Sequence, residues 1–140
     1  MPLHFELVTL ERTLFKEEAL QVTLPTTMGE ITVLPGHQAI VASLISGVAH
    51  LKRKDGGEED IAVSGGFIEI KDDVVRVLAD TAERGEDLDI EIIEQAKKRA
   101  EDIMKATDRR DDNAFAAAAA ALERELARYR VANKRRRIHK

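Results

Sequence analysis

Residues 61–89 decide the fold and read IAVSGGFIEIKDDVVRVLADTAERGEDLD. Apolar and polar residues alternate on both sides of Asp72 and Asp73, which is the period-two pattern of half-buried strands. Another alternating run ends at Gly65 and Gly66. After Leu78 the apolar spacing lengthens to nearly four residues and stays so to the end of the sequence. We therefore predict that a β-domain ends here and a helical segment begins.

Toward the N-terminus the same alternation recurs in short runs. With the runs quoted above, they make about eight to ten strands at spacings typical of a sandwich or barrel. Pro25 is expected to end a strand because it cannot donate to a ladder. Asp55, Gly56 and Gly57 predict a hairpin turn. We place this β-domain at residues 1–86.

Toward the C-terminus, residues 87–140 predict two helices. Asp87 or Asp89 is a candidate cap for the first. The polar residues 107–113 form the turn between them. Each helix carries one narrow apolar stripe, which we expect at Leu88, Ile92, Ala96, Ala100 and Ile103 and at Phe115, Ala118, Ala119, Leu122, Leu126 and Tyr129. Because the stripes are rich in alanine, little apolar area is buried between them. We predict an antiparallel hairpin that docks weakly and is able to move.

Composition excludes several functions. The chain has 140 residues, no cysteine, no tryptophan and 4% aromatic residues. Disulfides, thiolate metal sites and cysteine nucleophiles are therefore excluded, and a base-stacking nucleic-acid surface is disfavoured. No apolar run approaches the roughly 20 residues that cross a bilayer, and the first residues do not have the pattern of a signal peptide.

Charge is distributed unevenly along the chain. Residues 1–87 contain 8 basic and 16 acidic side chains, whereas residues 88–140 contain 14 basic and 10 acidic ones. Residues 128–140 carry seven basic side chains and no acidic one. Such a segment is attracted to an acidic surface; the alternative is a solvated helix end whose cations favour the helix dipole.

No set of residues suggests catalysis. The four histidines lie far apart in sequence, and none has a partner at the spacing of a zinc site. The paired glycines after Ser64 are too short for a phosphate-binding loop and favour a bulge or a close backbone approach. The acidic residues 58–60 and 72–73 are interpreted as solvated turn residues, with a cation site as the weaker alternative.

Arg124 and Arg128 lie one helical turn apart. They could bind a phosphate or an acidic partner through paired hydrogen bonds, or they could pair with neighbouring glutamates on a solvated face. Both readings stay open.

Three segments resemble the epsilon subunit of bacterial and chloroplast F-type ATP synthases. They are LPGH at residues 34–37, VSGGFIE at 63–69 and VLADTAER at 77–84, followed by GEDLD at 85–89. The resemblance runs nearly end to end and implies an α+β fold, with an N-terminal ten-stranded β-sandwich followed by a C-terminal antiparallel two-helix hairpin.

The resemblance also implies a role in the rotating central stalk. Such a subunit binds the gamma subunit and the ring of c subunits, is not itself an enzyme, and couples proton flow to ATP synthesis. It restrains ATP hydrolysis when its hairpin extends along gamma into the catalytic alpha/beta hexamer. The implied location is peripheral, on the cytoplasmic face of the membrane, with no nucleic-acid partner.

Residue roles carry over only at matching positions. The c-ring contact corresponds to Thr26, Thr27, Met28 and Glu30, and the gamma contact includes His37. The basic segment that faces the hexamer corresponds to Arg128, Arg135, Arg136 and Arg137.

Some family members bind ATP on the folded hairpin. Asp89 matches the first half of their motif, but Ile92 and Ile93 replace its Arg-Ala pair. Arg124 and Arg128 match second-helix arginines, so these two and Asp89 are the candidate nucleotide residues. We predict weak or absent ATP binding and no bound cofactor. The alternative function is a free-standing nucleotide-binding sensor.

Overall fold

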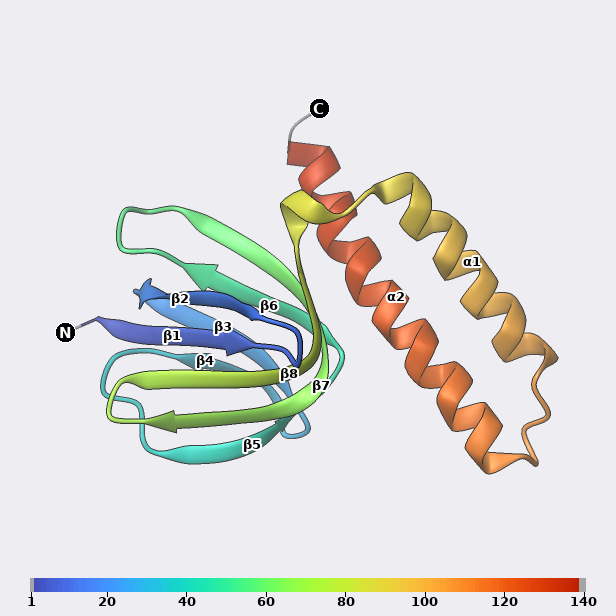
Figure 1. Ribbon diagram of the computed structural model, residues 1–140, viewed down its shortest axis with the longest axis horizontal. Helices are drawn as coiled ribbons and strands as arrows, with labels where there is room; N and C mark the ends of the chain where they lie inside the picture. Colours follow the sequence, from blue (N-terminus) through green and yellow to red (C-terminus); the bar gives the residue numbers. More distant parts are fainter. Residues whose placement is uncertain (1, 139–140) are drawn as a thin grey trace.

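The computed structural model describes residues 2–138, with side chains as far as Lys134. The described chain contains eight strands, one turn of 3-10 helix and two α-helices (Figure 1). The strands are β1 (Leu3–Val8), β2 (Thr13–Ala19), β3 (Gln21–Thr26), β4 (Gly29–Val33), β5 (Ile40–Leu44), β6 (Gly47–Lys52), β7 (Glu58–Lys71) and β8 (Val74–Arg84). They are followed by η1 (Gly85–Asp87), α1 (Ile90–Ala106) and α2 (Asp112–Ile138).

The strands form one continuous sheet that folds over into a two-layered sandwich. Its order is β2-β1-β8-β7-β5-β3-β4, and β6 pairs with β3 and β7. The first half of β7 pairs with β6 and its second half with β5. The long strand β7 therefore belongs to both layers. The predicted α+β class with a sandwich and two helices is confirmed.

Two glycines allow β7 to change layers. Ser64 pairs with Thr81 and Gly66 with Ala79, so the register of β7 against β8 continues unchanged past Gly65, which is not itself paired. Gly66 has φ of 124°, and a Cβ there would lie 1.9 Å from the carbonyl oxygen of Leu78. An alternating run was expected to end at these glycines, but β7 continues through them, whereas the expected close backbone approach is confirmed at Gly66. This continuation accounts for one of the two strands by which the described chain, with eight, differs from the ten that the resemblance implies.

The expectation for Pro25 was also wrong. Pro25 lies within β3, opposite Glu30 of β4. On its other edge β3 changes partner at this point, from β6 at Thr23 to β5 at Thr26. A residue without a backbone N–H is tolerated there because no ladder bond is required of it.

The main hydrophobic core lies between the two layers of the sandwich. It is built from inward-facing residues of all eight strands in the described chain, and the largest of them, including Phe5, Leu51 and Ile68, are almost fully buried. No helix residue of the described chain belongs to this core cluster. The sandwich is therefore a self-contained hydrophobic unit.

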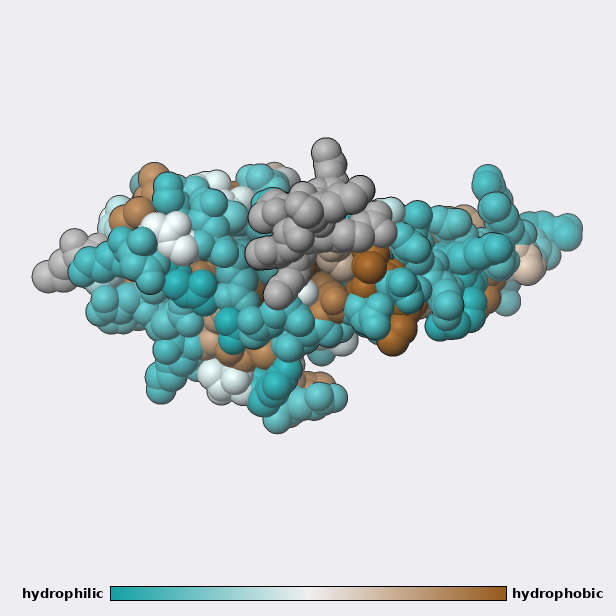
Figure 2. Space-filling view, turned by 90° about the horizontal axis from the view of Figure 1, so that it is seen from above, coloured by the Kyte–Doolittle hydropathy of each residue, from teal (hydrophilic) through white to brown (hydrophobic). Residues whose placement is uncertain are grey.

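The helices form an antiparallel hairpin in which α2 lies between the sandwich and α1 (Figure 1). Asp89 caps α1 by accepting hydrogen bonds from the backbone N–H of Glu91 and Ile92, at 3.0 and 3.4 Å. Figure 2 shows a mostly hydrophilic surface over the helical part of the molecule, with small hydrophobic areas.

The predicted stripe of α1 was partly wrong. Ile93 and Ala100 are buried, but Ile92 and Ile103 are 58% and 60% exposed. Residues 90–93 contain three isoleucines, so the apolar spacing fits either of two neighbouring helix faces. The structure shows that the face containing Ile93 is the one that contacts α2. Across this seam the Lys97 ammonium lies 4.6 Å from the ring centroid of Tyr129.

Candidate functional site: the junction of sandwich and helices

The C-terminal half of α2 packs against the sandwich through small side chains. Ala127 is fully buried, and Val131 and Ala132 are nearly so. The helix contacts β6, β7 and η1 as well as α1. Because α2 has neighbours on two sides, it buries residues on two faces. The face toward the sandwich consists of small residues, so only the stripe toward α1 stood out in the sequence.

A three-residue ion cluster joins α2 to β8. The Arg128 guanidinium lies 2.8 Å from Glu83 of β8, and it also donates to Glu125, one helical turn earlier, at 2.8 Å. Glu125 is only 6% exposed. A nearly buried carboxylate needs a paired cation, so Arg128 is important both for the charge of Glu125 and for the attachment of α2.

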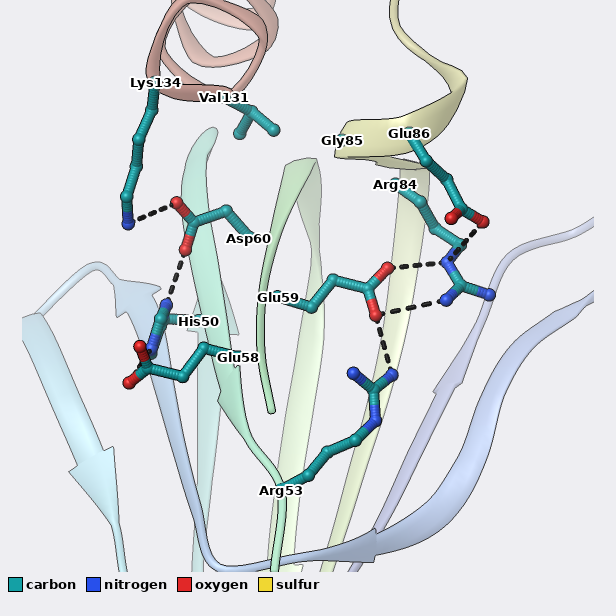
Figure 3. A pocket seen from close by; sticks show the side chains of 10 residues that line it. All are labelled: His50, Arg53, Glu58, Glu59, Asp60, Arg84, Gly85, Glu86, Val131 and Lys134. Carbon is teal, nitrogen blue, oxygen red and sulfur yellow. Dashed lines mark hydrogen bonds and ion pairs between the residues drawn. The ribbon is translucent and has the colours of Figure 1, made fainter. Parts of the chain in front are cut away.

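A second cluster centres on Asp60 of β7 (Figure 3). One carboxylate oxygen lies 2.5 Å from Nδ1 of His50 on β6, and the other lies 2.7 Å from Nζ of Lys134 on α2. Burial raises the pKa of Asp60, but the hydrogen bonds from His50 and Lys134 lower it by more, so the pKa lies below its usual range. Asp60 therefore carries a negative charge at neutral pH and holds the end of α2.

A third cluster braces the strands below the junction. The Glu59 carboxylate accepts hydrogen bonds from Arg84 at 2.6 Å and from Arg53 at 2.7 Å (Figure 3). Burial raises the pKa of Glu59, whereas the bonds from the two arginines lower it below its usual value. Arg84 also stacks 4.8 Å from the ring centroid of Phe15.

The interpretation of residues 58–60 as solvated turn residues was wrong for two of them. The side chains of Glu59 and Asp60 are only 14% and 13% exposed, whereas Glu58 is 55% exposed. The reason is that β7 begins at Glu58, so these residues lie in a strand that other elements cover. The weaker alternative, a cation site, is not seen: no group of three or more His, Asp or Glu side chains within the described part is arranged to hold a metal.

A cavity of about 420 Å³ that is open to solvent lies where the second and third clusters meet η1 and α2. Most of its lining residues are charged, and His50, Val131 and Gly85 are the exceptions (Figure 3). The attachment of α2 is therefore partly ionic and open to water, unlike the dry core of the sandwich.

The candidate nucleotide residues have other partners. Asp89 caps α1, Arg128 is held by Glu83 and Glu125, and Arg124 lies 3.9 Å from Glu125 and is 47% exposed. These contacts agree with the reading in which Arg128 pairs with nearby glutamates, although its face is largely covered rather than solvated.

The c-ring candidates lie at the β3–β4 turn. Thr26 is buried, and its hydroxyl donates to the carbonyl of Gly29 at 2.6 Å and accepts from the N–H of Met28 at 3.1 Å. Thr27 and Glu30 are exposed, and Met28 is 70% exposed. The turn is thus a braced protrusion with an apolar tip.

The gamma candidate His37 lies in the turn that precedes β5. It is half-buried, and its ring Nδ1 lies 2.6 Å from the carbonyl oxygen of Gln38. The neighbouring Gly36 donates its N–H to Asp73 at 2.7 Å, which ties this turn to the β7–β8 hairpin. Of the hexamer candidates, Arg128 is described above, and the side chains of Arg135, Arg136 and Arg137 lie outside the described residues.

Sequence reasoning missed an apolar outer face of the sandwich. Val41, Phe67 and Leu78 are 73%, 62% and 51% exposed. They lie on the neighbouring strands β5, β7 and β8, and Leu78 pairs with both Phe67 and Val8 of β1. We call these four residues the apolar face. A signal was present, because each occupies the outward position of an alternating strand where a polar residue is usual.

Comparisons with known proteins agree with this architecture. Residues 2–85 match the family described as "ATP synthase, Delta/Epsilon chain, beta-sandwich domain". An ATP synthase epsilon chain of Moorella thermoacetica is 42% identical over 130 residues, which cover 93% of this chain and 96% of that protein. One from Dehalococcoides mccartyi is 44% identical over 136 residues, covering 96% and 94%.

A solved structure extends the similarity to the helices. A chain of the Euglena gracilis mitochondrial ATP synthase, in the structure of its OSCP/F1/c-ring part, superposes with a TM-score of 0.76 at 25% identity. The match covers 87% of this chain and 76% of that chain.

The chain therefore belongs to the ATP synthase delta/epsilon chain family. Its relatives over nearly the whole length are epsilon chains, so it is a non-catalytic central-stalk subunit of an F-type ATP synthase. None of the described helices is both long and apolar enough to cross a bilayer.

Proposed function

We propose that this subunit couples rotation of the c-ring to ATP synthesis and restrains ATP hydrolysis through its helices. The observation that carries this proposal is the contrast between a self-contained sandwich core and a helix attached by small and charged side chains. The sandwich (residues 1–86) acts as the fixed platform in the rotor, and the hairpin (residues 87–140) acts as the movable element. The complex works at the cytoplasmic face of the membrane.

The gamma subunit docks on the apolar face. Exposed apolar side chains on adjacent strands of a rigid sheet are typical of a protein interface, and Phe67 and Leu78 give this one two large neighbouring side chains. His37 precedes β5, the strand that carries Val41, and we place it at the rim of the same interface.

The c-ring contact is the braced β3–β4 turn. Met28 supplies an apolar tip, and Thr27 and Glu30 supply polar and acidic groups beside it. Thr26 acts indirectly, because its buried hydroxyl holds the turn in shape. A braced turn transmits torque better than a flexible one, since none of the applied rotation is lost in bending.

The hexamer contact requires release of α2. In the docked state Arg128 is neutralised by Glu83 and Glu125. Once α2 leaves the sandwich, Arg128 loses Glu83 but keeps Glu125 of its own helix, and it joins Arg135, Arg136 and Arg137 in a basic segment that is attracted to acidic surfaces of the catalytic subunits.

Reconstitution with the remaining synthase subunits tests these roles separately. We expect deletion from Leu88 onward to raise ATP hydrolysis while assembly with gamma is kept; unchanged hydrolysis would refute the restraint. We expect Phe67→Glu to abolish co-purification with gamma. Thr32→Glu, the same change at an exposed residue on β4, is the matched control and should co-purify normally.

The alternative of a nucleotide sensor has less support, because Asp89 and Arg128 already have partners in the folded hairpin. We expect calorimetry on the whole chain to show no ATP binding at micromolar concentrations. Binding at that level would favour the sensor.

A further inference from the structure

Asp60 is shared between a histidine of the sandwich and the end of the movable helix. Its two carboxylate oxygens contact different groups: one faces His50 within the sandwich and the other faces Lys134 of α2 (Figure 3). Histidine is the side chain that usually gains or loses its charge between about pH 5 and 8. One carboxylate therefore contacts both the sandwich histidine that could bind a proton and the helix that docks.

We propose that His50, Asp60 and Lys134 form a proton-sensitive latch that holds α2 to the sandwich and weakens when His50 is protonated. We refer to these three residues as the latch. It concerns docking of the helix in this chain and does not depend on any effect of the helix on ATP hydrolysis.

The sign follows from the charges around Asp60. When α2 is docked, the Lys134 cation already neutralises Asp60, which leaves less net negative charge to stabilise an imidazolium at His50. When α2 leaves, Asp60 is free to pair with that imidazolium alone. A proton thus binds more readily to the undocked state, and by linkage a lower pH shifts the equilibrium toward undocking.

The other charged groups near the latch leave this sign unchanged. From β7, Glu58 lies 3.4 Å from Nε2 of His50 in a contact that lies within the sandwich and does not involve α2. Glu59 is neutralised by Arg53 and Arg84, and Glu86 of η1 lies 3.5 Å from Arg84. From α2, the described residues that line this cavity are Lys134 and the uncharged Val131.

Two further observations support the latch. The pKa of Asp60 lies below its usual range because His50 and Lys134 hydrogen-bond to it, so this carboxylate keeps its negative charge at the pH values of the test. The cavity beside the latch is open to water, so a proton reaches His50 without unfolding of the sandwich.

The test measures docking directly in the full chain. Because the sequence contains no cysteine, Lys54→Cys and Ala117→Cys create a unique pair of labelling sites, on the sandwich and on α2. Single-molecule energy transfer between two dyes then gives the undocked fraction. We expect this fraction to be about three times larger at pH 5.5 than at pH 7.5. A change of this size corresponds to the contribution of one partly exposed ion pair to docking.

Three variants decide whether the latch is responsible. His50→Gln keeps a donor for Asp60 but cannot gain a charge, and we expect its undocked fraction not to depend on pH. Lys134→Gln should raise the undocked fraction at pH 7.5 and remove most of the pH dependence. His4→Gln, which removes an exposed histidine of β1, should behave like the parent chain.

The proposal is overturned if the parent chain shows no pH dependence, or if His50→Gln or Lys134→Gln retains it in full. Far-ultraviolet circular dichroism checks that His50→Gln is folded, and Lys134 is 55% exposed, so its replacement does not endanger the sandwich. A chain that shows the pH effect but fails to restrain hydrolysis would refute the restraint and leave the latch intact.

Discussion

The sandwich and the hairpin are stabilised in different ways. The sandwich buries large side chains such as Phe5, Leu51 and Ile68 in one dry core. The hairpin buries mainly alanines, with Ile93 as its only fully buried large apolar residue within the described chain, and is attached through Arg128 and Lys134. Apolar burial scales with area, whereas a partly exposed ion pair such as Lys134–Asp60 contributes little, and the charges of the Arg128–Glu125 pair lose hydration when they are buried. One chain therefore combines a rigid platform with an element that needs little free energy to leave it.

The largest expected effect tests the bend that shapes the platform. Gly66→Ala would place a Cβ 1.9 Å from the carbonyl oxygen of Leu78, at a φ of 124°. We expect a loss of about 4 kcal/mol or more in the free energy of unfolding, measured by urea denaturation. Gly56→Ala is the control, because its φ of 92° is also positive but no heavy atom lies within 4 Å. It should cost about 1 kcal/mol.

The second prediction compares the two regions directly. Ile68→Ala should cost about 3 kcal/mol in the unfolding of the sandwich, because it leaves a cavity in the core. Ile93→Ala should destabilise the hairpin alone. Tyr129 is the single tyrosine of the chain and lies in the helix seam, so its fluorescence reports on the hairpin. If Ile93→Ala shifts the sandwich transition equally, the two regions form one cooperative unit and the contrast fails.

The third prediction concerns the attachment of α2. Arg128→Gln leaves Glu125, which is 6% exposed, with only the longer 3.9 Å contact to Arg124. We expect a loss of about 2 kcal/mol in docking, seen as faster amide hydrogen exchange in α2 with unchanged exchange in β1 and β8. Arg130→Gln removes an exposed arginine of the same helix and should change exchange little. Equal effects of the two variants would show that the Glu83 pair does not hold the helix.

The smallest expected effect is a pH dependence within the platform. The pKa of Glu59 is lower in the folded chain than its ordinary value, because its bonds to Arg84 and Arg53 outweigh the effect of burial. The stabilisation is therefore present above the unfolded pKa and is lost as the pH falls through the folded one. We expect Glu59→Gln to reduce the free energy of unfolding at neutral pH by about 1 kcal/mol. We also expect the free energy of unfolding of this variant to fall less steeply as the pH is lowered through the acid range, which we call the acid limb. Glu18→Gln, at an exposed residue of β2, should leave that limb unchanged.

Local patterns predicted the elements, but not how far they extend. Alternation identified the strands, and Asp89 was one of the two candidate caps, because both signals depend on neighbouring residues. The continuation of β7 through Gly65 and Gly66 was missed, since a glycine pair reads equally well as an end or as a bend. Which layer each half of β7 joins is decided by β5 and β6, far away in sequence.

The junction was harder to predict for the same reason. Lys134 meets Asp60, and Arg128 meets Glu83, only after α2 has returned to the sandwich. Ala127 and Ala132 are too small to mark a packing face in a helix that is rich in alanine. One clue was available: residues 58–60 directly precede an alternating apolar run, so they could have been read as part of the strand that buries them.

The separation of the two cores also has a consequence for biosynthesis. Every residue of the sandwich core precedes the helices in the chain, so the ribosome completes the platform before it makes α2. The nascent sandwich is therefore able to fold while its charged docking surface, with Asp60 and Glu83, still faces solvent. These carboxylates keep that surface soluble until the basic helix emerges and covers it.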